Sequence, residues 1–154
     1  MEESEGDGTP DRRQVDKSTV ERGNPMADSH EERLRRMAIG LVETFHVLRE
    51  ALALLPIPIV VEVVGLSDSA ELSQRMERVR DLIRDEPVPE GAVIHLDLAI
   101  LAFLSAFDVT HIAQHAEEIA WREDATFVLL KQVAAYLAVV AFFLEEDDEE
   151  SQED

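Results

Sequence analysis

Two histidines and a glutamate at helical spacing are the residues of this chain best suited to chemistry. They are His111, His115 and Glu118, within the stretch HIAQHAEE. On a continuous helix, residues four and seven positions apart fall on one stripe. Zinc and other divalent ions accept imidazole and carboxylate ligands. The spacing therefore predicts a divalent metal site, or a pH-sensitive stripe in which an imidazole titrates beside Glu118.

The alternative is that this stripe is the polar face of an amphipathic helix. Its opposite side is apolar, with Ile112 and Ile119, and polar faces normally meet water. A metal also needs further ligands and supporting hydrogen bonds, which would have to come from His46, or from His95 and Asp97. The last two lie in an apolar run, where an ionisable group needs a partner, and Asp97 could reach one on another helix. We therefore favour a solvated or ion-paired face over a metal site.

The composition excludes several classes of site. The chain of 154 residues has no cysteine, which removes a disulfide framework, a thiolate nucleophile and a cysteine-rich zinc site. It also lacks a G-x-S-x-G nucleophile motif and a G-x-x-x-x-G-K phosphate loop. We therefore expect no enzymatic activity and no organic cofactor, with a divalent metal as the one cofactor left open.

The charge of the chain argues against anionic partners. The sequence contains 34 acidic and 14 basic residues, a net charge of −20 at pH 7. Such a charge opposes binding to nucleic acid and to anionic lipid. Residues 145–154 hold eight acids and no base, and 12 of the basic residues are arginine. An acidic, lysine-poor chain resembles proteins of salt-loving organisms, in which salt screens the self-repulsion.

The elements that must position these residues are predicted to be helices. Apolar residues recur every three or four positions, and capping residues, Pro and Gly bound the runs; Asp68 with Glu71, for example, can open the second helix. These signals predict helices at about 29–55, 68–85, 93–122 and 125–144, joined into one all-α domain, an antiparallel bundle of about four helices. The β-branched segment 57–64 could form a short strand. Residues 1–28 and 145–154 are expected to be disordered tails, and the polar N-terminus, without a signal-peptide core, indicates a cytoplasmic protein.

Two helices carry the strongest signals for an interaction surface. The predicted first helix has an unbroken apolar heptad seam, made up of Leu34, Ala38, Leu41, Phe45, Leu48, Leu52 and Leu55. The predicted last helix is apolar on every side apart from Lys131 and Gln132. A helix that is apolar all round is a core helix or an oligomer contact. Its 20 residues could also span a bilayer, but Lys131 would cost roughly 2.5–3.5 kcal/mol near the bilayer centre. The candidate surface comprises Leu34, Leu41, Phe45, Leu48, Leu137 and Phe142.

The predicted function is accordingly that of a non-catalytic helical interaction or assembly protein, which binds a protein partner or itself. One alternative is a metal-binding or pH-sensing protein that uses His111, His115 and Glu118. Another is a transcription regulator, because VVEVVGLSDSAELSQRM resembles the centre of a helix-turn-helix motif. The fit is incomplete, since the position six after Gly65, where the motif is apolar, is Glu71.

Overall fold

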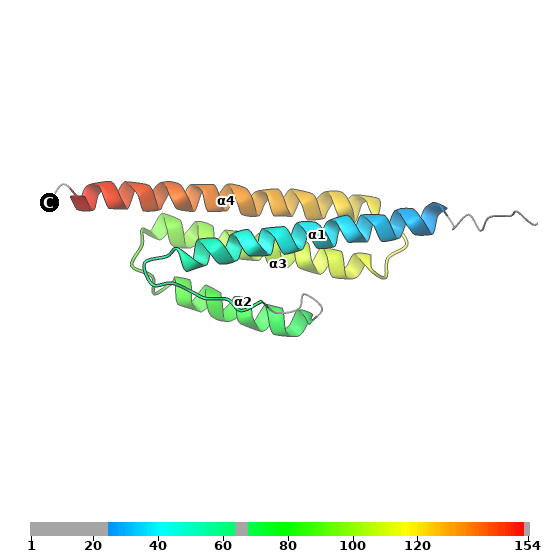
Figure 1. Cartoon of the computed structure of the whole chain (residues 1–154), viewed down its shortest axis with the longest axis horizontal. Coiled ribbons are helices and arrows are strands. Elements are labelled where there is room, and N and C mark those ends of the chain that lie inside the picture. Colours follow the sequence, from blue (N-terminus) through cyan, green and yellow to red (C-terminus); the bar gives the residue numbers. More distant parts are fainter. Residues whose placement is uncertain (1–24, 64–67, 153–154) are drawn as a thin grey trace, which may run out of the picture.

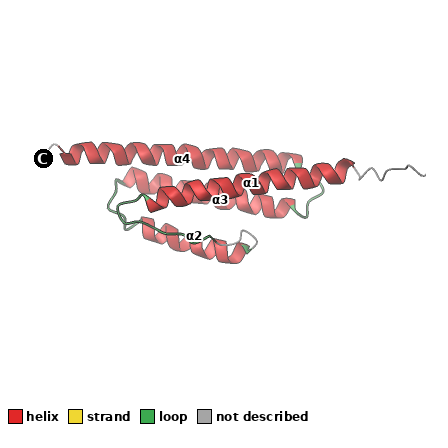
Figure 2. Cartoon of the chain, in the orientation of Figure 1, coloured by secondary structure: helices red, strands yellow, loops and turns green. Residues whose placement is uncertain are grey.

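Four helices make up the described part of the protein. The structure is a computed structural model that describes residues 25–63 and 68–152. Its helices are α1 (Pro25–Ala53), α2 (Ser69–Ile83), α3 (Glu90–Ala113) and α4 (Ala120–Gln152) (Figure 1). The described ranges contain no strand (Figure 2). The predicted all-α fold is therefore confirmed.

The helices are layered around α3. Helix α3 contacts α1, α2 and α4, whereas α4 contacts only α1 and α3 among the helices. Figure 1 shows α4 along one edge of the bundle and α2 along the opposite edge. The connection after α1 carries the chain back along the bundle, so α2 runs in the same direction as α1 (Figure 1). Helix α3 runs opposite to the other three helices. Helices α1 and α4 are thus parallel neighbours, a detail that the expected antiparallel order did not include.

The predicted seam of α1 packs into the main core. Leu41, Phe45, Leu48 and Leu52 are all buried, and the Phe45 ring stacks on Phe103 of α3 at 5.6 Å between centroids. Near the start of the helix the buried position shifts by one residue. There Met37 is buried, while Ala38, which belonged to the predicted seam, is exposed. The shift follows because a straight helix of 3.6 residues per turn drifts from a repeat of 3.5.

Helix α2 follows its sequence signals closely. The Asp68 side chain caps it by accepting a hydrogen bond of 3.0 Å from the backbone N–H of Glu71, as predicted. Its buried stripe consists of Leu72, Met76, Val79 and Ile83, and this stripe packs toward α3. The helix begins at Ser69 and ends at Ile83, within one or two residues of the predicted bounds.

The connection between α1 and α2 is extended but has no strand partner among the described residues. Ile59 and Val61 point into the core, while Val60 is exposed. Individual hydrogen bonds attach this connection to its neighbours. The Arg49 guanidinium donates to the carbonyl oxygen of Val61, and the N–H of Ile57 donates to the Glu86 carboxylate. The expected strand near 57–64 is therefore absent over 57–63, and residue 64 lies outside the described residues.

The largest departure from the predicted helices lies between α3 and α4. One helix was expected over 93–122, but α3 starts at Glu90 and ends at Ala113, and α4 starts at Ala120. The break lets Ile119 fold back into a small buried cluster with Met37 and Ala113, against the start of α1. Burial of Ile119 in this cluster outweighs the local preference for a continuous helix. Sequence periodicity indicates only that local preference.

The C-terminal bound also differs from the prediction. Helix α4 continues to Gln152, through much of the acidic segment that was expected to be a disordered tail from residue 145. Extending a formed helix by one residue costs far less than nucleating one, and glutamate is a good helix former. The predicted N-terminal tail lies largely outside the described residues, whose first helix begins at Pro25.

Candidate functional site

The histidine motif does not form the stripe that its spacing predicted. His111 lies in the last turn of α3, whereas His115 and Glu118 lie in the connection after it. All three are exposed, and the two imidazole rings lie 6.3 Å apart between centroids. Within residues 25–63 and 68–152, no three His, Asp or Glu side chains are grouped so that they could hold a metal ion. The continuous helix on which the metal hypothesis depended ends at Ala113.

The helix-turn-helix hypothesis also loses its first element. Residues 57–63, which would form the end of the first helix of that motif, are extended. The arginines of α2, which could have contacted phosphates, are largely engaged with carboxylates. Arg75 pairs with Glu71 at 2.6 Å and Arg84 with Asp81 at 3.0 Å. These pairs offset much of the positive charge of α2 that would attract a DNA backbone, while Arg78 of the same helix is exposed.

A buried carboxylate fixes the start of α4 to α1. The Glu123 side chain is 9% exposed and accepts hydrogen bonds from Arg33 at 2.7 Å and from Arg36 at 2.9 Å. Burial opposes ionisation of this carboxyl, but the hydrogen bonds from Arg36 and Arg33 outweigh burial and hold its pKa below the ordinary value of 4.5. Both carboxylate oxygens of Glu123 are engaged by Arg33 and Arg36, so we call this cluster a clamp and assign Glu123 a structural role.

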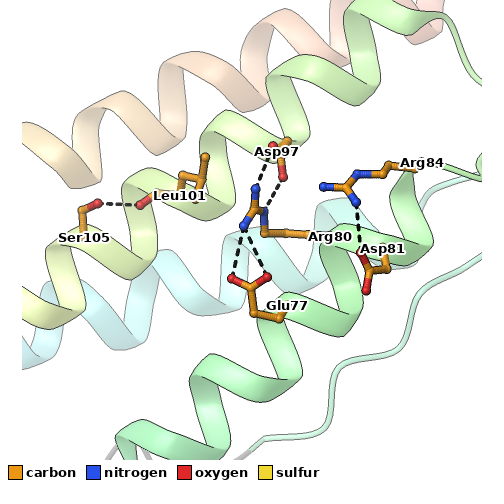
Figure 3. Close-up of polar contacts among 7 residues, drawn as sticks. All are labelled: Glu77, Arg80, Asp81, Arg84, Asp97, Leu101 and Ser105. Carbon is orange, nitrogen blue, oxygen red and sulfur yellow. Dashed lines mark hydrogen bonds and ion pairs between the residues drawn. The ribbon is translucent and has the colours of Figure 1, made fainter.

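A second ion pair joins α2 to α3, as Figure 3 shows. Arg80 donates to both oxygens of Asp97, at 2.6 and 3.3 Å, and to Glu77 at 3.1 Å. The expectation that Asp97 could find a partner on another helix is confirmed. His95, by contrast, is hydrogen-bonded within α3 through Nδ1, which lies 2.6 Å from the carbonyl oxygen of Gly91.

Most of the predicted interaction surface lies inside the protein. Leu41, Phe45 and Leu48 are buried in the core of the chain itself. Leu34 and Leu137 are partly buried against the two core clusters. The sixth residue is Phe142 of α4, which is 54% exposed. The seam of α1 therefore serves intramolecular packing, and Phe142 is the residue of the predicted surface whose side chain is largely exposed to solvent.

The exposed side of α4 forms a continuous strip. We call it the outer strip and define it by Trp121, Val128, Lys131, Ala135, Ala138 and Phe142, all of which are exposed. Their spacings alternate between three and four residues once Asp124 is included, which is exposed on the same face between Trp121 and Val128, so they lie on one face of the helix. This face points away from α1 and α3, at the edge of the bundle (Figure 1).

The outer strip belongs to a helix that is more apolar than its burial requires. Helix α3 and residues 120–149 of α4 are both long and apolar enough to cross a membrane, by length and composition. In α3, 44% of the most apolar window is buried inside the fold, but in α4 the share is only 17%. The central position of α3 accounts for its composition. Packing within the chain accounts for only one side of α4, where residues such as Leu130, Val133 and Val140 are buried.

A shallow apolar groove adjoins the outer strip. It runs between α1 and α4, and its walls are formed by Glu43, Thr44, Val47, Leu130, Val133, Ala134 and Leu137. Val47 is itself 51% exposed. The groove widens the apolar area beside the strip and places one carboxylate, that of Glu43, at its rim. A flat apolar face with few polar groups suits a protein partner better than a small polar ligand.

Sequence reasoning identified Phe142 but not the strip to which it belongs. Residues 125–144 are apolar on every side, so hydropathy periodicity cannot show which side faces the core. No known protein family, no curated protein and no solved structure matches this chain.

Proposed function

We propose that this chain is a cytoplasmic, non-catalytic assembly protein that associates with a protein partner through the outer strip of α4. The observation that carries the proposal is the mismatch between composition and burial, since only 17% of the most apolar window of α4 is buried. Apolar area left in water is favourable to bury, at about 25 cal/mol per Å². A helix that lays its apolar face against a partner helix gains this term.

The exposed apolar side chains of the outer strip give association a physical driving force. The net charge of −20 keeps an apolar strip soluble through self-repulsion, and it makes nucleic acid an unfavourable partner. It also suits a salt-rich environment, in which the repulsion between associating copies is screened.

Sedimentation velocity on the full chain tests the proposal. We expect a species larger than the monomer that dissociates in the Phe142→Ser variant, because serine removes the large exposed apolar side chain at the C-terminal end of the strip. Leu82→Ser is the matched control, since Leu82 on α2 is 53% exposed, close to the 54% of Phe142. A protein that stays monomeric throughout, or that responds equally to both variants, would contradict the proposal.

A lipid surface is the competing destination for an exposed apolar helix. The same variants distinguish it, because flotation with neutral phosphatidylcholine vesicles reports membrane binding directly. Binding to vesicles that is lost in Phe142→Ser and kept in Leu82→Ser, with no self-association, would replace the proposed function by a membrane-associated one.

A further inference from the structure

The charges along α4 distinguish among the partners that its outer strip could take. Lys131 is the only cation on the strip within the described residues. Beyond Phe142 the same face continues into Glu145, Glu146 and Glu149, all exposed. One positive charge thus lies near the middle of the helix, and a block of negative charge lies at its C-terminal end. An anionic membrane would repel this block.

A second copy of α4 running antiparallel complements this arrangement. Placing the two-fold axis between Ala135 and Ala138 brings each alanine opposite the other one of the partner. In this register the Lys131 stem lies over the partner's Phe142, and its ammonium group comes within reach of the partner's Glu145. The symmetry repeats the pair, so each dimer gains two opposite-charge contacts, whereas Asp124 on the same face comes opposite the partner's Glu149, a like charge.

A parallel pair of the same helices has the opposite electrostatics. In register, Lys131 would face the partner's Lys131, and Glu145 and Glu149 would face their own copies. Like charges at facing positions are destabilising, by amounts similar to those that opposite charges gain. The charge order along α4 therefore selects the antiparallel arrangement.

The small side chains at the centre of the strip permit close approach. Ala135 and Ala138 are exposed and lie next to each other on the face, and small residues at a crossing let two helix backbones pack closely. From Trp121 to Phe142 the strip is about 32 Å long at 1.5 Å per residue. With a width of about 12 Å it offers about 400 Å² on each copy, about 800 Å² in total, which fits a reversible dimer rather than an obligate one.

We infer that the partner of the outer strip is a second copy of this chain, bound through antiparallel α4–α4 packing with Lys131 paired to the partner's Glu145. The inference rests on the proposed function and adds to it the identity and direction of the partner. It also assigns Lys131 a role in partner choice, as the residue that makes one orientation of the dimer favourable.

Distances between single spin labels on the two copies test the direction. The chain has no cysteine, so one introduced cysteine gives one label per copy. The protein is measured at about 0.1–1 mM, because a small interface implies a weak Kd. In the antiparallel dimer, labels on Asp124→Cys lie about 40 Å apart, whereas labels on Gln132→Cys lie within about 20 Å. A parallel dimer brings both pairs within about 20 Å.

A charge-swap series tests the named contact. Lys131→Glu should weaken the antiparallel dimer about tenfold, and adding Glu145→Lys on the same chain should recover most of that loss, because the pair is restored with its signs exchanged. Gln132→Glu is the matched control, since it adds a negative charge next to Lys131 without removing the cation. In a parallel dimer Lys131→Glu exchanges one like-charge contact for another, so no rescue follows.

The outcomes separate the inference from the proposed function. Short distances at both labels, or a Lys131→Glu loss without rescue, would overturn the antiparallel pairing and leave association through α4 standing. A monomer at all concentrations, or a dimer that Phe142→Ser does not disturb, would overturn both. Flotation with neutral vesicles in place of dimerisation would assign the strip to a membrane.

Discussion

The clamp around Glu123 makes a quantitative prediction about how α4 is fixed to α1. Glu123→Gln keeps the size of the side chain but removes the negative charge that two arginines share. The carboxylate is 9% exposed, and its two hydrogen bonds measure 2.7 and 2.9 Å. Hydrogen bonds to a charged group contribute about 1.5–3 kcal/mol each, and an amide retains part of one. Allowing for solvent around the arginines, we expect a loss of about 1–3 kcal/mol.

Urea unfolding of the variant and the wild type at equal protein concentration measures this loss. Asp124→Asn is the matched control, because Asp124 is the next residue and is exposed. The expected loss corresponds to a melting temperature lower by about 4–12 °C for a domain of this size. A Glu123→Gln protein as stable as the Asp124→Asn control at pH 7 would refute the assignment of Glu123 as a clamp.

The pH dependence of the same pair of proteins gives a second reading of the clamp. The pKa of Glu123 is lowered by folding from its ordinary value of 4.5, so the unfolded state binds a proton more readily than the folded state. The stabilisation is therefore fully present above pH 4.5 and is lost as the pH falls below it through the folded pKa. The difference in stability between wild type and Glu123→Gln should shrink over that acidic range. A difference that grows on acidification would show that the sign is wrong.

Three further predictions follow from packing and charge. Leu48→Ala, at a fully buried site in the main core, should cost about 2–5 kcal/mol in urea unfolding, and a loss below about 1 kcal/mol would place Leu48 outside the core. A double-mutant cycle with Arg80→Ala and Asp97→Ala should give a coupling of about 1 kcal/mol between α2 and α3, whereas additive losses would mean that the pair contributes nothing. Association through α4 should strengthen from 0.1 to about 1 M salt, because the Debye length falls from about 10 to about 3 Å and the repulsion between copies of charge −20 is then screened. Association that weakens across that range would contradict the apolar strip as the driving contact.

The sequence was informative wherever one side of a helix is polar. In α1 and α2 the alternation of apolar and charged residues revealed the buried stripe, and Asp68 marked the start of α2. Met37 was misassigned by one position, because a heptad template drifts from the true helical period over several turns.

The break before α4 could not be read in the same way. Ala116 and Ile119 continue the apolar periodicity of α3, and no Gly or Pro interrupts the chain there. What ends the helix is the packing of Ile119 with Met37, which lies more than eighty positions away along the chain. A tertiary contact of this kind leaves no local signal. The same break explains why the histidine motif looked like a site in sequence and is a turn in three dimensions.

The candidate site was only partly visible for a related reason. Apolar composition indicated that the last helix meets a core or a partner, and it singled out Phe142. It could not show which side faces outward, because Leu130 and Val133 in the core and Val128 on the surface are chemically alike. Only the placement of α1 and α3 against one side of α4 defines the outer strip.

The most direct test of association through the outer strip is hydroxyl-radical footprinting of the unmodified full chain over a range of protein concentrations. Phe142 and Leu82 have nearly equal exposure in the single chain, 54% and 53%, so each serves as a reference for the other. If copies associate through the outer strip, oxidation of Phe142 falls as the protein concentration rises, while oxidation of Leu82 stays constant. An oxidation rate of Phe142 that stays as constant as that of Leu82 at every concentration would contradict it, because the outer strip would then remain open to solvent.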